Sequence, residues 1–524
     1  MQLISKSEAA GLVKSGDRLL VGGFGSYGCP EELLEALADR HATSAEPSGL
    51  AVVCGITPGD KTESLEPLKG YNVGLNRLRA DGLIDTFIAG NLTDARAIAY
   101  MVGDDKIACW LPPLGIMLNM LRSAAAGRPG VLTRVGLKTF ADPRLDGCAF
   151  NARAKSSAPM VELVTLGGKE YLFYKAFERA DVAFIRATYA DEDGNLAMSH
   201  EGVTGPELDM ALATHNRGGI VVAQVEEIVR RGQLPAKQVR VHSTLVDYVV
   251  RAENRDNHRQ CYAAPGYRPE LCGEVKVAGE TVKTMPLSLR KVLARRGAME
   301  LRPGVIINLG SGIPSGIGSV AEEEGLTFST TVEAGPMGGI VQEGLWFPGV
   351  ANAEAIYSQL DTLDMYDGGF IDLAFLGFAE IDERGNTNVS YFAGRAIGAG
   401  GYINISQNAK KVYFLGNFSA GKAEIALTDS GLDIKSDGGT SKFVKRVQHV
   451  TFSGEYALEI GQEVMYITER AVFKLTPEGL ELIEIADGVD LERDVLGKME
   501  FRPLVSANLK TMDARLFRSA KMGL

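Results

Sequence analysis

An internal repeat constrains the fold of this chain more than any other feature of its sequence. The apolar run Ala180–Ala187 is followed by the loop Asp191–Asn195, which reads Asp-x-x-Gly-Asn. In the later part of the chain, the run Ile371–Phe378 is followed by Asp382–Asn386, which has the same pattern. This pattern is common turn chemistry by itself. Because strand, turn and order agree at both places, the sequence predicts two related halves.

Short β-branched runs alternate with longer amphipathic segments, which is typical of α/β folds with mainly parallel sheets. Lys14–Gly28 and Leu301–Gly318 open the two halves alike, each with a helix, a β-branched strand and a glycine-rich turn. The stretch Asn254–Lys283 is rich in charge, proline and glycine and suits a linker. We therefore predict two homologous open α/β halves fused in one chain, with domains at residues 1–275 and 285–524.

The composition argues against several classes of protein. A net charge of -11 over 524 residues does not supply the clustered Lys and Arg that nucleic acids require. The sequence has no uncharged apolar stretch of about 18 residues, so no membrane span is expected. Met1–Lys6 lacks the apolar run of a signal peptide, and the six cysteines form no CxxC pair, which together favour a reducing, cytoplasmic location. Six scattered histidines predict no metal site.

Three glycine loops are candidates for ligand contact. Gly23–Gly28 matches GxGxxG after a strand, but no acid follows the next strand, Ala51–Cys54, which weakens a dinucleotide interpretation. Gly310–Gly316 also follows a strand, and Glu333 stands where a ribose-binding acid would stand. The turn after Glu333 favours the close approach of another molecule instead. Backbone N–H groups of Gly398–Tyr402 could converge on an oxyanion or phosphate, although each cluster alone could be a simple turn.

Taken together, these motifs resemble the family I CoA-transferases of the long, single-chain acetate/propionate type. The resemblance covers nearly the whole length, and its pieces occur in the family's order. They are Val21–Gly25, Gly130–Leu137, Thr139–Phe140, Asp142–Arg144, Gly168–Leu172, Gln224–Ile228, Arg295–Leu301, Gly310–Pro314, Thr331–Glu333 and Gly398–Tyr402.

The resemblance implies a role for particular residues. Glu333 would be the catalytic nucleophile, and Gly400 and Gly401 would belong to the oxyanion motif. Substrate would lie near Gly23, Phe24, Gly25 and Leu114. Coenzyme A would contact Gly310, Ser311, Gly312, Ile313, Gly377, Gly398 and Gly401. The resemblance further implies acyl-CoA and short carboxylic acids as substrates, no metal or nucleotide cofactor, and a homo-oligomer, either a dimer or a tetramer.

The expected chemistry is a ping-pong transfer of CoA. A carboxylate is ionised at neutral pH and needs no general base to attack a thioester. Attack by Glu333 would give an anhydride and then a glutamyl-CoA thioester, without ATP or metal. An acyl-CoA hydrolase that uses the same glutamate and a non-catalytic CoA- or dinucleotide-binding protein are the alternatives.

The sequence departs from the family at three positions. Asn91 follows Gly90 where a histidine is usual, Leu114 stands where a glutamine is usual, and Tyr402 replaces phenylalanine. Leu114 predicts an altered or more apolar acyl pocket, with neutral drift as the alternative.

The remaining polar and reactive residues are expected to have structural rather than functional roles. The Asp191 and Asp382 loops are expected to be turns rather than cation sites, and Cys109 is expected to be buried. Lys410-Lys411 and Lys442–Arg446 are expected to be solvated charge rather than contacts to CoA phosphates.

Overall fold

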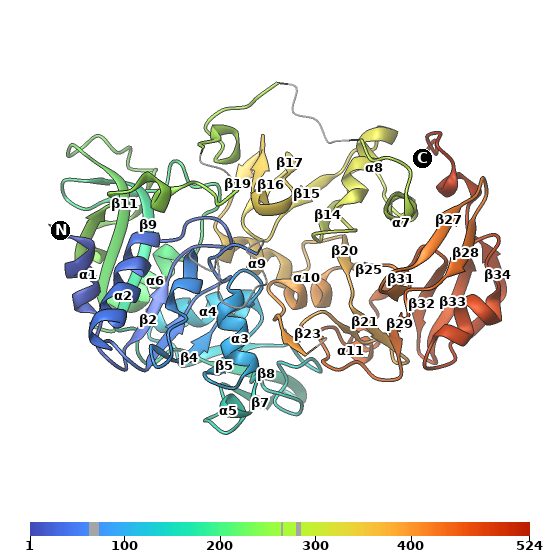
Figure 1. The fold of residues 1–524 in the computed structure, drawn as a ribbon, viewed down its shortest axis with the longest axis horizontal. Helices are drawn as coiled ribbons and strands as arrows, with labels where there is room; N and C mark the ends of the chain where they lie inside the picture. The colour runs from blue at the N-terminus through green and yellow to red at the C-terminus, as the bar shows by residue number, and fades with distance from the viewer. Residues whose placement is uncertain (62–72, 264–265, 279–283, 393) are drawn as a thin grey trace. The chain divides into compact units, whose positions relative to one another are not determined.

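The computed structural model describes residues 1–61, 73–263, 266–278, 284–392 and 394–524 (Figure 1). The chain divides into two compact units. The first unit contains Met1–Gly279, Val332–Asp364 and Ala393–Gly401, and the second contains Glu280–Thr331, Met365–Phe392 and Tyr402–Leu524. The predicted boundary between residues 275 and 285 divides the chain into two consecutive segments. The compact units differ from this division, because Glu333 and Gly398–Gly401 belong to the first unit.

A parallel sheet forms the centre of the first unit. Its strand order is β1-β13-β11-β9-β2-β3-β4-β5, and every neighbouring pair is parallel. The bounds of these strands are β1 Gln2–Leu3, β13 Tyr248–Arg251, β11 Ile220–Val229, β9 Val182–Asp191, β2 Arg18–Val21, β3 Leu50–Val53, β4 Ile84–Ile88 and β5 Ala108–Trp110. The larger helices are α1 Lys6–Leu12, α2 Glu31–Ser44, α3 Arg96–Gly103, α4 Leu114–Ala125 and α6 Glu207–Asn216, and α9 Gln359–Asp367 begins here. An antiparallel β6-β8-β7 sheet, made of Gly130–Thr133, Lys169–Lys175 and Val161–Leu166, is added to this unit.

The second unit repeats the parallel arrangement and extends it. Strands β15, β14, β20, β25 and β31 pair in parallel in that order, and β32, β33 and β34 continue the sheet. The bounds are β15 Ser329–Thr331, β14 Ile306–Leu309, β20 Leu373–Gly377, β25 Lys411–Leu415, β31 Glu463–Ile467, β32 Ala471–Thr476, β33 Gly479–Ile485 and β34 Leu504–Thr511. The helices of this unit are α7 Leu289–Ala298, α8 Gly316–Glu324, α10 Tyr402–Asn408 and α11 Gly454–Glu459.

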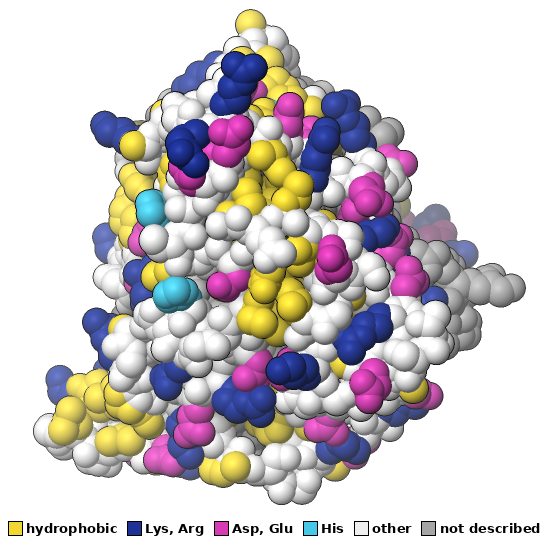
Figure 2. Space-filling view, turned by 90° about the vertical axis from the view of Figure 1, so that its left-hand side faces the viewer, with side chains coloured by type: hydrophobic (Ala, Val, Ile, Leu, Met, Phe, Trp, Pro, Cys, Tyr) yellow, Lys and Arg dark blue, Asp and Glu magenta, His cyan; other side chains and the backbone are white. Residues whose placement is uncertain are grey.

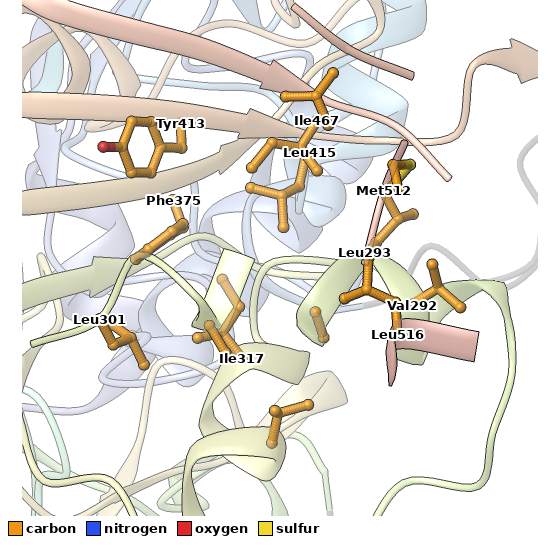
Figure 3. Packing of buried hydrophobic residues seen from close by; sticks show 14 of the residues in the cluster. Val292, Leu293, Leu301, Ile317, Phe375, Tyr413, Leu415, Ile467, Met512 and Leu516 are labelled. Carbon is orange, nitrogen blue, oxygen red and sulfur yellow. The ribbon is translucent and has the colours of Figure 1, made fainter. Parts of the chain in front are cut away.

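Apolar side chains from helices and sheet form the core of the second unit. Figure 3 shows Leu293 of α7 and Ile317 of α8 in one cluster with Phe375, Leu415 and Ile467 of the sheet. All five side chains are buried. The β-branched and aromatic residues that predicted strands therefore fill the layer between sheet and helices.

The internal repeat is visible in matching hydrogen bonds. Gly22 N donates to Phe184 O at 2.9 Å, and Gly310 N donates to Phe375 O at 2.8 Å. In both Asp-x-x-Gly-Asn turns, the first aspartate accepts from two backbone N–H groups and from the side-chain amide of the final asparagine. The predicted α/β fold of two halves with mainly parallel sheets is confirmed, and these aspartates act as turn residues, as expected.

The surface carries charge of both signs. On the face shown in Figure 2, Lys and Arg side chains alternate with Asp and Glu, and hydrophobic side chains gather in small groups. Within the described ranges, no helix has the length and apolar character needed to cross a bilayer.

Candidate active site

Two of the three predicted glycine loops lie where each sheet reverses its strand order. In the first unit, β2 lies between β3 and β9, and Gly22 to Gly25 follow β2. In the second unit, β14 lies between β15 and β20, and Gly310 follows β14. Such switch points at the carboxyl ends of parallel strands are where α/β sheets bind ligands.

Glu333 lies in a tight turn of the first unit. Gly335 N donates to Val332 O at 2.9 Å, and Val332 N donates to Pro336 O at 3.1 Å, so the turn closes around Glu333. Gly335 has φ +120°, and a Cβ there would lie 2.2 Å from Tyr357 O. Only glycine fits at this position, which explains why Gly335 stands in the Gly-Pro turn that follows Glu333.

Burial sets the acidity of the nucleophile candidate. It raises the pKa of Glu333 from its ordinary value of 4.5 to about 7, because a charged carboxylate loses solvation there. A hydrogen bond from the Gly401 backbone N–H opposes the rise by favouring the charged form. The carboxylate and one of the predicted oxyanion glycines are therefore in direct contact.

The Gly398–Gly401 loop is held by backbone contacts within the first unit. Gly400 N donates to Gly90 O at 2.8 Å, and Leu114 N donates to Gly400 O at 3.0 Å. Gly398 forms a bridge with Asn91, and a Cβ on Gly398 would lie 2.8 Å from the Asn91 Cα. In this conformation the Gly400 N–H holds the loop, whereas the Gly401 N–H faces Glu333.

Each of the three residues that depart from the family pattern has a defined environment in the structure. Asn91 Oδ1 accepts from both the backbone N and the hydroxyl of Thr57, each at 3.1 Å. Leu114 is fully buried at the start of α4. In the second unit, the Tyr402 hydroxyl donates to the Gly377 carbonyl at 3.0 Å, a bond that phenylalanine could not make.

The predicted substrate loop of Gly23, Phe24 and Gly25 contacts two buried acids. Gly23 N donates to Glu207 Oε1 at 3.2 Å, and a Cβ on Gly25 would lie 3.7 Å from Asp94 Oδ2. Burial raises the pKa of both Glu207 and Asp94 to about 7. No sequence motif marks either acid. The Gly205-Pro206 pair before Glu207 marks a helix start, but burial of the acid follows only from the fold.

Residues 55–59 connect the substrate loop to the Gly398–Gly401 loop. Gly59 N donates to Gly25 O at 2.9 Å, and Gly90 N donates to Gly55 O at 2.7 Å. The Ile56 side chain lies 3.5 Å from the position of a Cβ on Gly400. The structure thus brings Glu333, the Gly398–Gly401 loop, Leu114 and the substrate loop into one connected region of the first unit.

The residues predicted to contact CoA in the second unit lie at its switch point. Gly310, Ser311, Gly312 and Ile313 connect β14 to α8, and Gly377 ends β20. Arg290, which the sequence did not single out, donates to Gly312 O at 2.8 Å and to the Ser315 hydroxyl at 3.1 Å.

The prediction of solvated charge at Lys442–Arg446 holds for Lys445 and Arg446, which are exposed, but it is wrong for Lys442. Its ammonium lies 4.1 Å from the centroid of the Phe378 ring, and burial lowers its pKa to about 8. By contrast, Lys410 and Lys411 form exposed ion pairs with Asp372 and Glu463, as expected for solvated charge.

Two further sequence predictions concern the burial of Cys109 and the presence of a metal site. Cys109 is buried, as predicted, and burial raises the pKa of its thiol well above the usual range. Among the residues that the structure describes, no group of three or more His, Cys, Asp or Glu side chains is arranged to hold a metal.

Comparison with known proteins places this chain in a family. A sequence model described as coenzyme A transferase matches residues 4–252. Caffeate CoA-transferase of Acetobacterium woodii is 42% identical over 532 residues, covering 100% of this chain and 98% of the relative. Acetate CoA-transferase YdiF of Escherichia coli K12 is 40% identical, covering 94% of this chain and 90% of the relative.

Solved structures agree with the sequence relatives. The apoenzyme of the acyl-CoA transferase YdiF from E. coli O157:H7 superposes with a TM-score of 0.92 at 38% identity, covering 100% of this chain and 97% of that one. A thioester complex of the same enzyme with CoA gives a TM-score of 0.91 at 37% identity, again covering 100% and 97%. The chain belongs to the coenzyme A transferase family and is a CoA-transferase.

Proposed function

We propose that this enzyme moves CoA between a short-chain acyl-CoA and a free carboxylate through a glutamyl-CoA thioester at Glu333. The observation that carries the proposal is the contact between the Glu333 carboxylate and the Gly401 N–H in a partly buried turn. The solved thioester complex of the E. coli relative with CoA supports a covalent intermediate.

The first half-reaction conserves the thioester bond energy. A Glu333 carboxylate oxygen attacks the acyl-CoA carbonyl carbon, the C–S bond breaks, and CoA leaves as a thiolate. The thiolate then attacks the Glu333 carbonyl carbon of the mixed anhydride, which releases the acyl group as its carboxylate and leaves glutamyl-CoA. An acceptor carboxylate reverses these steps. Each addition develops an oxyanion, and one well-placed backbone donor stabilises such a transition state by about 3–4 kcal/mol.

Burial contributes to this chemistry in two ways. A carboxylate with few water contacts needs less desolvation before it attacks, and a site that excludes water protects both acyl intermediates from hydrolysis. We retain Gly400 and Gly401 in the oxyanion motif, with the Gly401 N–H as the donor and Gly400, whose N–H is bound to Gly90 O, holding the loop. Gly23, Phe24, Gly25 and Leu114 are retained as acyl contacts. The proposed CoA contacts are Gly310, Ser311, Gly312, Ile313, Gly377, Gly398 and Gly401. We also propose that catalysis uses no metal or nucleotide cofactor, and a cytoplasmic homo-oligomer stays a prediction.

A trapping experiment tests the proposal. Borohydride added after acyl-CoA should reduce a glutamyl thioester to the alcohol, and peptide mass analysis should locate it at Glu333. Glu333→Gln should give no adduct and no transfer, while Glu354→Gln, at an exposed acid of the same unit, should retain both. An unmodified Glu333 peptide in an active enzyme would refute the mechanism. Thiol release without any acceptor acid would indicate a hydrolase instead.

A further inference from the structure

Gln359 carries a buried amide whose hydrogen-bonding groups are unused. The side chain is 0% exposed, at the first residue of α9. Its Oε1 and Nε2 atoms have no hydrogen-bond partner among the residues that the structure describes. Its backbone N donates to Thr204 O at 3.0 Å, so the residue itself is firmly placed. A buried amide left without partners is costly and requires an explanation, such as a ligand.

The amide lies beside the glycine backbones that lead to Glu333. A Cβ on Gly55 would lie 3.5 Å from Leu118 Cδ2, 3.7 Å from Gln359 Oε1 and 3.8 Å from Leu114 Cδ1. The Gln359 amide oxygen and two leucines therefore converge on Gly55, which has no side chain of its own.

Backbone hydrogen bonds between Gly55, Gly90 and Gly400 connect this position to the proposed nucleophile, Glu333. Gly55 O accepts from Gly90 N at 2.7 Å, and Gly90 O accepts from Gly400 N at 2.8 Å. The next residue, Gly401, donates to the Glu333 carboxylate. The unpartnered amide thus belongs to the connected region that surrounds the reacting carboxylate.

A second buried glutamine shows what a purely structural amide looks like here. Gln224 is also 0% exposed. Its Nε2 donates to Asn257 O at 2.8 Å, and its Oε1 accepts from Glu32 N at 2.9 Å. The protein therefore binds both the oxygen and the nitrogen of the Gln224 amide, whereas among the described residues neither atom of the Gln359 amide has a partner.

We propose that the Gln359 amide hydrogen-bonds an oxygen carried by the acyl group of the substrate. The enzyme then favours acyl groups that bear a hydroxyl over the corresponding hydrocarbon. Leu114 and Leu118 contact the carbon chain, and Gln359 supplies the polar recognition at a position where the protein leaves an amide unpaired. This inference rests on the proposed function, because it assigns the substrate class to the same site.

The test compares matched acyl donors in Gln359→Met, a substitution of similar length without hydrogen-bonding groups. The donors are butyryl-CoA and its 2-, 3- and 4-hydroxy derivatives, with acetate as acceptor, and kcat/KM is measured for each. For at least one hydroxy derivative, the ratio of its kcat/KM to that of butyryl-CoA should fall tenfold or more in the variant. If all three ratios stay unchanged, the amide has another partner, such as a resident water, and the proposal is overturned.

Gln224→Met is the matched control for loss of a buried glutamine. It should lower the urea midpoint, since it leaves the Asn257 carbonyl and Glu32 N–H unpaired, while the substrate ratios stay unchanged. Gln359→Met should leave the midpoint unchanged or raise it. A borohydride adduct at Glu333 with butyryl-CoA should form in both variants. An unmodified Glu333 in the wild type would defeat the proposed function, whereas an intact adduct with unchanged ratios would defeat only the role of Gln359.

Discussion

The raised pKa of Glu333 should make the first unit less stable as the pH rises, because the buried carboxyl resists losing its proton. Burial raises the pKa of this carboxyl from 4.5 to about 7. Below pH 4.5 the folded and unfolded chains both hold the proton, so the group has no effect. Between pH 4.5 and 7 the unfolded chain releases the proton while the folded chain keeps it, and the stability falls. Above pH 7 the full cost of a buried carboxylate is present.

The size of this effect follows from the pKa. At about 1.4 kcal/mol per pH unit, the rise from 4.5 to about 7 corresponds to about 3 kcal/mol. Because Glu333 retains partial exposure, this value is an upper bound. Glu333→Gln removes the titration. We therefore expect the stability of the variant, relative to wild type, to increase by about 2–3 kcal/mol between pH 5 and pH 8.5.

Tryptophan fluorescence is the natural assay for this prediction. Both tryptophans of the chain, Trp110 and Trp346, lie in the first unit with Glu333. Urea unfolding followed by this signal therefore reports the unit that contains the buried acid. Glu354→Gln, which removes an exposed acid, should show the pH dependence of the wild type. A difference between Glu333→Gln and wild type that does not change with pH would refute the desolvation argument.

Three further outcomes follow from the same structure. The logarithm of kcat/KM for the acyl-CoA half-reaction should fall with unit slope below pH about 7, because in the proposed mechanism only ionised Glu333 attacks. A value of kcat/KM that stays flat down to pH 5 would contradict this. Tyr402→Phe should lower stability by about 1 kcal/mol in circular dichroism melts, through loss of the bond to the Gly377 carbonyl, and an unchanged melt would contradict a structural role for the hydroxyl. Glu201→Ala should destabilise the first unit by about 3–5 kcal/mol in tryptophan-monitored urea unfolding, because it leaves buried Arg186 unpaired; a loss below about 1 kcal/mol would show that solvent reaches the pair.

Local patterns were sufficient to predict the fold class. The apolar runs Ala180–Ala187 and Ile371–Phe378 lie in or beside strands β9 and β20, and the Asp-x-x-Gly-Asn turns that follow them have matching hydrogen bonds. These features depend on strand periodicity and turn chemistry, which are encoded within a few residues. The glycine loops after β2 and β14 were found for the same reason.

The composition of the site could be predicted only in part. Glu333 and Gly398–Gly401 are marked by sequence motifs, although their grouping with the first unit depends on compact packing across long stretches of chain. Asp94, Glu207 and Gln359 carry no motif, and their importance comes from burial, which a single sequence does not reveal. The burial of Lys442 cannot be predicted from its sequence, because a charged residue is usually solvated and the packing of Lys442 against Phe378 is a tertiary effect.

The burial that disfavours the Glu333 carboxylate also suits the attack that we propose for it. A fully solvated glutamate would ionise readily but would have to lose its water before reaching a thioester carbon. A glutamate buried without any donor would remain protonated at neutral pH and could not attack at all. The Gly401 N–H holds the side chain between these limits, since its hydrogen bond favours the charged form while the surroundings oppose it. The destabilisation expected above pH 7 and the proposed nucleophilicity of Glu333 would therefore have one physical origin, and a substitution that relieves the first should abolish the second.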